Sequence, residues 1–326
     1  MGSMSDHRSA DETVRATPVR TRQPSGLVLV GVDGSPRNRA AIAWTVREAR
    51  ETGLGLLAVT VLPSSDRTPP PQPAWVAHRA LLRASLVEER LRNRHRPPDK
   101  AFLLASGTPG PALARSARPG DLVVVGKRGA GTLQRLRIGS TSLSAATFVR
   151  VPLIMVPESW DQGAHAGAHL VVGVDGSGRH GKDGPALDLA FSRAARLGVP
   201  VLVFLGLELP PLHRWSVAEL TSQAREREAR LTALLGEWTR RFPRVQVGVR
   251  AATTAPTVGL LDAARGAQLL IVGRGTRRGA LERLSLGSTA RRVLQEATCP
   301  VAVAPLVPSA FSPEDALNHH DQESVA

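Results

Sequence analysis

The sequence predicts an α/β protein built from two tandem copies of one parallel-sheet domain, with helices on both faces of each sheet. The first observation is an internal repeat, because the hexapeptide VGVDGS occurs at Val30–Ser35 and again at Val172–Ser177. The second is a regular alternation of short apolar runs with longer segments of helical spacing. The third is that the apolar runs are nearly continuous in Val, Leu and Ile, which is typical of strands covered on both faces. This alternation favours parallel strands joined by right-handed crossovers.

Two further matches extend the repeat in the same order through both halves. The tripeptide Gly139-Ser140-Thr141 recurs as Gly287-Ser288-Thr289. The closing apolar segment Val151–Pro157 recurs as Cys299–Pro305. An ordered set of matches is what a duplicated domain leaves in a sequence.

In the first copy, apolar runs and helical spacings alternate from end to end. The expected strands are Leu27–Val32, Leu56–Leu62, Ala101–Ala105, Asp121–Val125 and Leu153–Val156. The expected helices are Arg37–Thr52, Val76–Arg94, Pro109–Ala117 and Ser140–Val149. Pro109 suits the first turn of a helix, where its missing N–H costs nothing. The proline-rich insert Pro69–Pro73 is expected to form a surface loop, because proline cannot donate to a strand ladder.

The second copy has the same order. Its expected strands are Leu170–Val174, Val201–Leu207, Val245–Val249, Leu269–Val272 and Val301–Ala304. Its expected helices are Leu187–Leu197, Val217–Arg240, Val258–Ala264 and Thr289–Glu296. The domains are therefore expected at 26–157 and 169–306, joined by a small, polar linker at 158–168. The polar ends, 1–25 and 307–326, are expected to be disordered tails.

Length and composition agree with this organisation. A chain of 326 residues is long enough for about two domains, and no apolar run reaches the roughly 18 residues that a membrane span needs. Its single cysteine, Cys299, excludes an intrachain disulfide and suits a cytoplasmic location; we expect a small core residue there. The net charge of +14 comes from arginines spread along the chain. Solvated helix faces account for them better than a nucleic-acid surface does, since aromatic residues make up only 3%.

Two glycine-containing segments follow strands that are expected to end at the same edge of the first sheet. Asp33-Gly34-Ser35 follows the first strand, and Gly126–Gly131 follows the fourth. In an open parallel sheet, ligands bind beyond the carboxyl ends of the strands, where the strand order reverses. Glycine lets backbone N–H groups approach an anion without a Cβ clash, and the helix after Gly139 offers free N–H donors.

The side chains around these segments suit a polyphosphate. Ser140 and Thr141 add hydroxyl donors, and Lys127 and Arg128 add positive charge. Asp33 fits better as an acceptor for a ribose hydroxyl, or as a carboxylate near a divalent ion. The alternative is structural, because glycine turns after strands are common and an Asp there is often only a helix cap. The segments match neither the P-loop nor the Rossmann pattern.

The spacing Gly126-x2-Gly129-x9-Gly139-Ser140 resembles the nucleotide motif of universal stress proteins, as do VGVDGS, Gly107-x-Pro109 and the closing VPLIMVP. The resemblance covers both copies. It implies a tandem universal stress protein with an adenine nucleotide alpha hydrolase-like fold and strand order 3-2-1-4-5. It also implies ATP, often with Mg²⁺. On this resemblance, Asp33 contacts the ribose side of ATP and the backbone near Val61 faces adenine. The residues that hold the phosphates would be Gly126, Gly129, Gly139, Ser140 and Thr141.

The second copy departs from this motif. Asp175 is retained, and Gly273, Gly287 and Ser288 are its candidate binding residues, but the loop is one residue longer. Depending on which end is counted from, the second glycine is replaced by Thr276 or by Arg277, and in the latter count Arg274 replaces the first. Thr254 stands where the first copy has Gly107. A side chain where the backbone should approach phosphate predicts that nucleotide is held mainly in the first copy.

Three functions remain open at this point. The first is ATP binding in stress response or signalling, through nucleotide-dependent conformation or association. The second is a slow Mg²⁺-dependent ATPase using the same pocket, although no convincing base for water and no catalytic residue can be named. The third is a stress-response scaffold that binds no nucleotide. The resemblance also implies domain pairing through the last strands, within the chain or in a homo-oligomer. We expect no membrane partner and do not expect a nucleic acid.

Overall fold

The computed structural model of the chain describes residues 26–62, 100–129, 138–161, 163, 168–176, 183–206, 216–252, 255–274 and 286–305. The expected helix Val76–Arg94, the insert Pro69–Pro73 and both predicted tails lie outside these residues. Of the helices in the described part, none is long and apolar enough to cross a membrane.

All the described strands form one ten-stranded sheet in the order β3-β2-β1-β4-β5-β10-β9-β6-β7-β8. The first copy supplies β1 Leu27–Gly31, β2 Gly55–Leu62, β3 Lys100–Ser106, β4 Leu122–Gly126 and β5 Leu153–Val156. The second supplies β6 Leu170–Val174, β7 Val201–Gly206, β8 Val247–Ala252, β9 Leu269–Gly273 and β10 Val301–Ala304. Each half is parallel and has the order 3-2-1-4-5, so the predicted fold class is confirmed.

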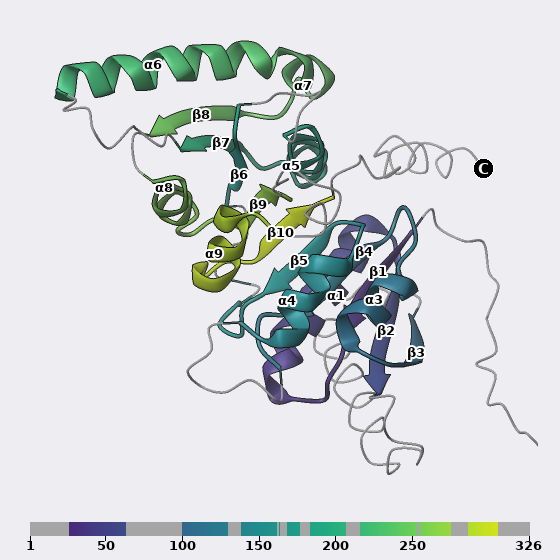
Figure 1. Cartoon of the computed structure of the whole chain (residues 1–326). Helices are drawn as coiled ribbons and strands as arrows, with labels where there is room; N and C mark the ends of the chain where they lie inside the picture. Colours follow the sequence, from purple (N-terminus) through teal and green to yellow (C-terminus); the bar gives the residue numbers. More distant parts are fainter. Residues whose placement is uncertain are drawn as a thin grey trace, which may run out of the picture.

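The two halves meet through their last strands. β10 pairs with β5 in the antiparallel direction, with Ala302 opposite Ile154 at the centre. Figure 1 shows this junction in the middle of the molecule, with the first copy on one side and the second on the other. The expected pairing of last strands within one chain is therefore confirmed. Because β5 and β10 already pair with each other within one chain, two chains would have to associate through another surface.

Helices cover both faces of the sheet. The first copy has α1 Arg39–Thr52, α3 Pro109–Ser116 and α4 Ser140–Phe148. The second has α5 Gly184–Leu197, α6 Val217–Leu234, α7 Gly236–Arg241, α8 Pro256–Ala263 and α9 Ser288–Glu296. One core lies under α1, α5, α6 and α7, and another lies under α3, α4, α8 and α9. Each core contains residues of both copies, so the halves form one continuous hydrophobic structure.

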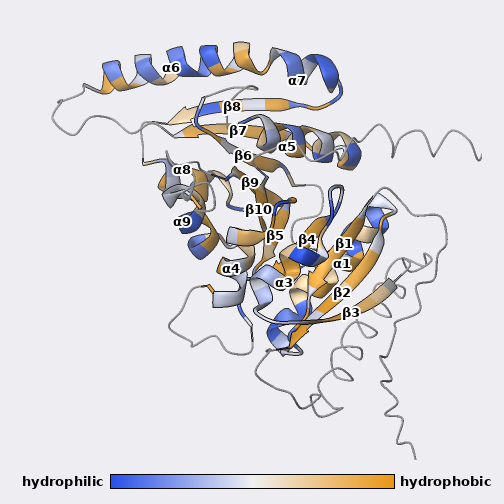
Figure 2. Ribbon diagram, turned by 45° about the vertical axis from the view of Figure 1, so that its right-hand side comes forward, coloured by the Kyte–Doolittle hydropathy of each residue, from blue (hydrophilic) through white to orange (hydrophobic). Residues whose placement is uncertain are grey.

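The strands alternate between these two cores. In β5, for example, Leu153 and Met155 face the α4 side, whereas Ile154 and Val156 face the α1 side. Figure 2 shows the apolar strands sandwiched between helices of mixed polarity. This two-sided burial explains why the apolar runs in the sequence are continuous rather than alternating.

Most element boundaries agree with the sequence-based expectations to within about two residues, and three of the expected elements differ by more. The helix expected at Val217–Arg240 is two helices that meet at Leu235, next to Gly236, which has low helix propensity. Helix α5 begins at Gly184, earlier than expected, with Asp183 as its N-cap. Strand β8 begins and ends later than expected.

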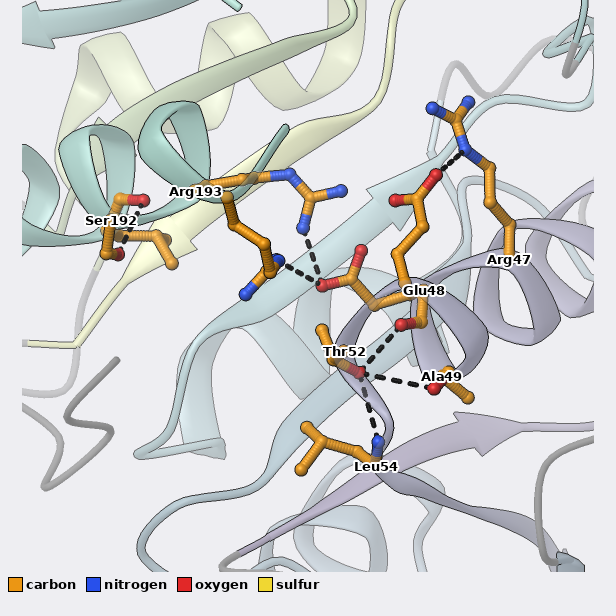
Figure 3. A network of polar contacts seen from close by, with 10 residues as sticks. Arg47, Glu48, Ala49, Thr52, Leu54, Ser192 and Arg193 are labelled. Carbon is orange, nitrogen blue, oxygen red and sulfur yellow. Dashed lines mark hydrogen bonds and ion pairs between the residues drawn. The ribbon is translucent and has the colours of Figure 1, made fainter. Parts of the chain in front are cut away.

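Helices α1 and α5 also make a polar contact between the copies. Arg193 Nη1 of α5 lies 2.6 Å from Glu48 Oε1 of α1, and Arg196 Nη2 lies 3.1 Å from the same oxygen. Figure 3 shows the two guanidinium groups converging on this carboxylate. All three side chains are largely buried, so the interface between the copies contains an ionic cluster as well as a strand pair.

Candidate functional site

The candidate site lies where the strand order of the first copy reverses. β1 pairs with β2 on one side and with β4 on the other, and both parallel pairings bring the carboxyl ends to one edge. Asp33 follows β1 and the segment after Gly126 follows β4, so the two predicted segments are brought together here. This is the place where open parallel sheets bind ligands. Val61 lies at the end of β2, at the same edge, and its side chain is partly buried.

Asp33 is exposed, and its carboxylate is held in a defined position. The backbone N–H and the hydroxyl of Ser35 donate to Asp33 Oδ1 at 3.0 and 2.9 Å. The intervening Gly34 has a φ of 75°, a left-handed conformation that favours glycine. The Asp-Gly-Ser sequence therefore makes a tight turn that presents one carboxylate at the edge of the sheet.

Gly129 lies directly against that carboxylate. A Cβ at Gly129 would lie 2.4 Å from Asp33 Oδ2, closer than side chains tolerate. The absence of a side chain at Gly129 thus lets the carboxylate of Asp33 lie against this backbone. Residues 130–137 of the same loop lie outside the described part of the chain.

The start of α4 is tied to the turn after β4. The N–H of Gly139 donates to the carbonyl of Lys127 at 2.9 Å, and Ser142 Oγ donates to the carbonyl of Gly126 at 2.6 Å. Ser140 and Thr141, in the first turn of α4, are exposed. The predicted phosphate-binding residues Gly126, Gly139, Ser140 and Thr141 thus belong to one hydrogen-bonded unit. Ser142 is buried and was not a candidate, although its place in the first turn of the helix could have suggested it.

The side chain of Lys127 extends to the second copy and not toward the predicted phosphate position. The sequence predicts that its charge neutralises phosphate, but its amine donates to the carbonyl of Ala297 in the second copy at 2.8 Å. The backbone of Lys127 stays in the turn, where its N–H donates to the carbonyl of Val156 at 2.7 Å. Arg128, the next residue, is partly buried. A phosphate contact by Lys127 would require its amine to leave Ala297.

The two copies differ at the residue that precedes the first helix. In the first copy, the buried Asn38 donates from Nδ2 to the carbonyl of Gly31 at the end of β1. In the second copy the corresponding residue is Asp183, also buried, whose Oδ1 accepts from the N–H of Asp175 at 2.9 Å. Asp175 itself is exposed. The second copy therefore places two carboxylates at the edge where the first has one, and this opposes the approach of a polyphosphate.

The second copy also lacks parts of the turn that joins β4 to the start of α4 in the first copy. Gly273 ends β9 and Gly287 precedes Ser288 at the start of α9, but Ala290 stands where the first copy has Ser142. Arg274 follows Gly273 and is 2% exposed. Burial, together with the charge of Arg150, lowers the pKa of Arg274 to about 10, so it remains charged at neutral pH. Thr254, Thr276, Arg277 and Arg278 lie outside the described residues.

Three further features of the described part of the chain bear on other functional sites: metal ligands, the cysteine and a surface groove. No group of three or more His, Cys, Asp or Glu side chains there could hold a metal ion. Cys299 is buried, as expected of a small core residue, and burial raises the pKa of its thiol to about 11. A groove of about 790 Å³ runs along β2, β3 and α3, but none of the predicted site residues lines it.

Comparison with known proteins agrees with this architecture. The sequence model of the Universal stress protein family matches residues 26–157 and 168–305. A universal stress protein of Mycobacterium tuberculosis is 29% identical over 306 residues, which cover 85% of this chain and 94% of that protein. One from Mycolicibacterium smegmatis is 30% identical over 303 residues, covering 85% and 96%. The crystal structure of a universal stress protein from Archaeoglobus fulgidus superposes with a TM-score of 0.57 at 15% identity, covering 87% of this chain and 99% of that one. The chain belongs to the universal stress protein family, in a form with two tandem copies of the domain.

Proposed function

We propose that the protein binds ATP, with Mg²⁺, mainly in its first copy, and acts in stress response or signalling through nucleotide-dependent conformation or association. The observation that carries the proposal is the unit formed by Gly126, Gly129 and Gly139 at the strand-order reversal. Glycine backbone without side chains at the end of β4 lies beside the N-terminus of α4. A glycine turn next to a helix N-terminus is a common phosphate-binding arrangement, because free backbone N–H groups point at the anion. Membership of the universal stress protein family supports the proposed role in stress.

The roles of the individual residues follow from their places. Asp33 would accept from a ribose hydroxyl, the backbone near Val61 would face adenine, and Ser140 and Thr141 would donate to phosphate oxygens. Lys127 and Arg128 would add positive charge. Because the described residues hold no cluster of metal ligands, Mg²⁺ would arrive with the phosphates rather than in a protein cage. In the second copy, Asp175, Gly273, Gly287 and Ser288 are the weaker candidates.

Hydrolysis is the alternative use of the same pocket. An ATPase needs a group that orients or activates water. The carboxylate available at the turn, Asp33, accepts two hydrogen bonds from Ser35 and lies against Gly129. We therefore expect binding with little or no turnover, and a phosphate-release assay on the purified full chain separates the two functions.

The most direct test of ligand identity is mass spectrometry of the small molecules released when purified full-length protein is denatured. An adenine nucleotide, retained through dialysis and present at a fixed ratio to protein, is the expected result. Protein that carries no nucleotide and does not bind added ATP in a calorimeter would leave the scaffold function as the account of this chain.

A further inference from the structure

Lys127 and Arg274 occupy equivalent positions in the two copies, and the side chain of each binds the backbone of the other copy. Lys127 follows the glycine that ends β4, and its Nζ donates to the carbonyl of Ala297 at 2.8 Å. Arg274 follows the glycine that ends β9 and donates from Nη1 to Thr147 at 2.8 Å and from Nη2 to Val149 at 2.5 Å, in both cases to the carbonyl. In each copy, the side chain of the residue after the fourth strand thus donates hydrogen bonds to backbone carbonyls of the other copy.

The accepting carbonyls belong to helix C-termini. Val149 is the C-cap of α4 and Ala297 is the C-cap of α9. The last carbonyls of a helix lack partners within the helix and carry the negative end of its dipole, so a cation there is stabilising. Neither helix has a basic residue of its own in its last turn. The opposite copy supplies the missing charge.

The other end of α4 is the candidate phosphate site. Gly139 is its N-cap, and Gly139 and Ser142 tie its first turn to the turn after β4. The helix has nine residues, so Arg274 holds one end of a short rigid body whose other end meets the proposed nucleotide. The two hydrogen bonds that Arg274 makes across the interface are both at the C-terminal end of α4.

We infer that Arg274 is a positioning residue for the nucleotide site of the first copy, which it fixes by anchoring α4 across the interface. The inference rests on the proposed function and adds a regulation to it: ATP affinity in the first copy depends on the arrangement of the second. Because coupling between sites is reciprocal, ATP bound in the first copy stabilises the contact of Arg274 with α4. Lys127 makes the matching contact with the C-terminal end of α9.

The affinity test uses three full-length variants. Arg274→Met removes the charge and keeps an unbranched apolar chain, Arg274→Lys restores the residue type that the first copy uses, and Arg265→Met is the charge-matched control. Arg265 is a suitable control because its side chain is 82% exposed and its ion pair is with Asp262, in the same copy. We expect Arg274→Met to weaken ATP binding roughly tenfold, within the usual range for coupling between sites. Arg274→Lys should recover most of the loss, and Arg265→Met should bind as the wild type does.

Calorimetric titration, with the folded fraction of each variant measured by circular dichroism, distinguishes positioning from stability. A residue that only stabilised the fold would lower the melting temperature and leave the affinity of the folded protein unchanged. Equal ATP affinity in folded Arg274→Met and wild type therefore overturns the inference while leaving the proposed function intact. No ATP binding by the wild type would overturn both.

A second measurement needs no variant, in case Arg274→Met does not fold. Hydrogen exchange on the wild-type chain, with and without saturating ATP, is expected to show slower exchange at Gly139 and Ser140. It should also show slower exchange at the C-terminal turn of α4 and at the end of β9 in the second copy. Protection confined to the turn after β4 and the start of α4 would contradict the coupling.

Discussion

Glu48 and Arg193 occupy equivalent positions in the two copies and carry opposite charges. Each stands five residues before the left-handed glycine that ends its helix, Gly53 in α1 and Gly198 in α5. The two side chains form an ion pair of 2.6 Å, with 3% and 6% of their side-chain surfaces exposed. The guanidinium carbon of Arg193 also lies 5.2 Å from the centroid of the Trp44 ring, a cation–π contact.

A second pair of positions repeats this relationship. Glu51 and Arg196 each stand two residues before the same glycines. Two like copies paired through this surface would bring Glu48 against Glu48, or Arg193 against Arg193, in a buried place. The charges therefore favour pairing of a first copy with a second copy, which is the arrangement within one chain.

The first prediction is a charge exchange. Glu48→Arg alone should lower the free energy of unfolding by about 3–5 kcal/mol, because it buries like charges without a partner. Adding Arg193→Glu should restore a large part of that loss. Urea denaturation of the wild type, both single variants and the double variant gives the coupling free energy. Additive losses in the double variant would show that the two residues do not act as a pair.

The second prediction concerns acid. Burial opposes the charge of Glu48, but the guanidinium groups of Arg193 and Arg196 outweigh it and hold the pKa of Glu48 below its ordinary value. A carboxylate with a lowered folded-state pKa stabilises the protein fully above its unfolded pKa, about 4.3, and loses that contribution as the pH falls through the folded pKa. Urea midpoints between pH 7 and pH 3 should therefore fall more steeply for the wild type than for Glu48→Gln. Parallel curves would contradict the assignment.

The third prediction concerns the contact between Gly129 and Asp33. Gly129→Ala would bring a methyl group to 2.4 Å from Asp33 Oδ2, so the carboxylate must move. Because moving the carboxylate weakens its two hydrogen bonds from Ser35, we expect a loss of about 1 kcal/mol in the free energy of unfolding. In an Asp33→Ala background the same substitution should cost little. An equal cost in both backgrounds would show that the carboxylate is not the group that requires glycine.

The fourth prediction concerns Cys299. Its thiol is 3% exposed and has a pKa of about 11, so almost none of it is thiolate at pH 8. Labelling of the native protein with a thiol reagent at pH 8 should be slow and should accelerate in urea, in step with unfolding. Rapid labelling of the native protein would indicate that the segment before β10 opens locally.

The repeat and the continuous apolar runs were enough to predict both sheets, because two-sided burial leaves that signature in the residues themselves. The strand order came from the resemblance to universal stress proteins. The break at Gly236 and the earlier start of α5 at Gly184 were missed because local propensity fixes helix ends only weakly.

The glycine spacing of the candidate site could be read from the sequence, and the directions of its side chains could not. Gly126, Gly129 and Gly139 stand out by spacing, and the structure brings them together around the turn after β4. The direction of Lys127 depends on where α9 of the other copy ends, 170 residues away along the chain, and no local pattern encodes that. The same holds for Arg274 and for the ion pair of Glu48 with Arg193.

The central claim is that the first copy holds ATP at the N-terminus of α4. Gly139 has φ of −76° and ψ of 149°, an extended conformation that valine adopts readily, so Gly139→Val adds side-chain bulk without backbone strain. Gly287→Val makes the same change at the matching N-cap of the second copy.

Calorimetric titration of ATP and Mg²⁺ into the wild type and these two variants tests the claim most directly. We predict saturable binding in the wild type, a loss of at least about 100-fold in affinity for Gly139→Val, corresponding to about 2.7 kcal/mol, and retained binding in Gly287→Val. Unchanged affinity in folded Gly139→Val would contradict the claim.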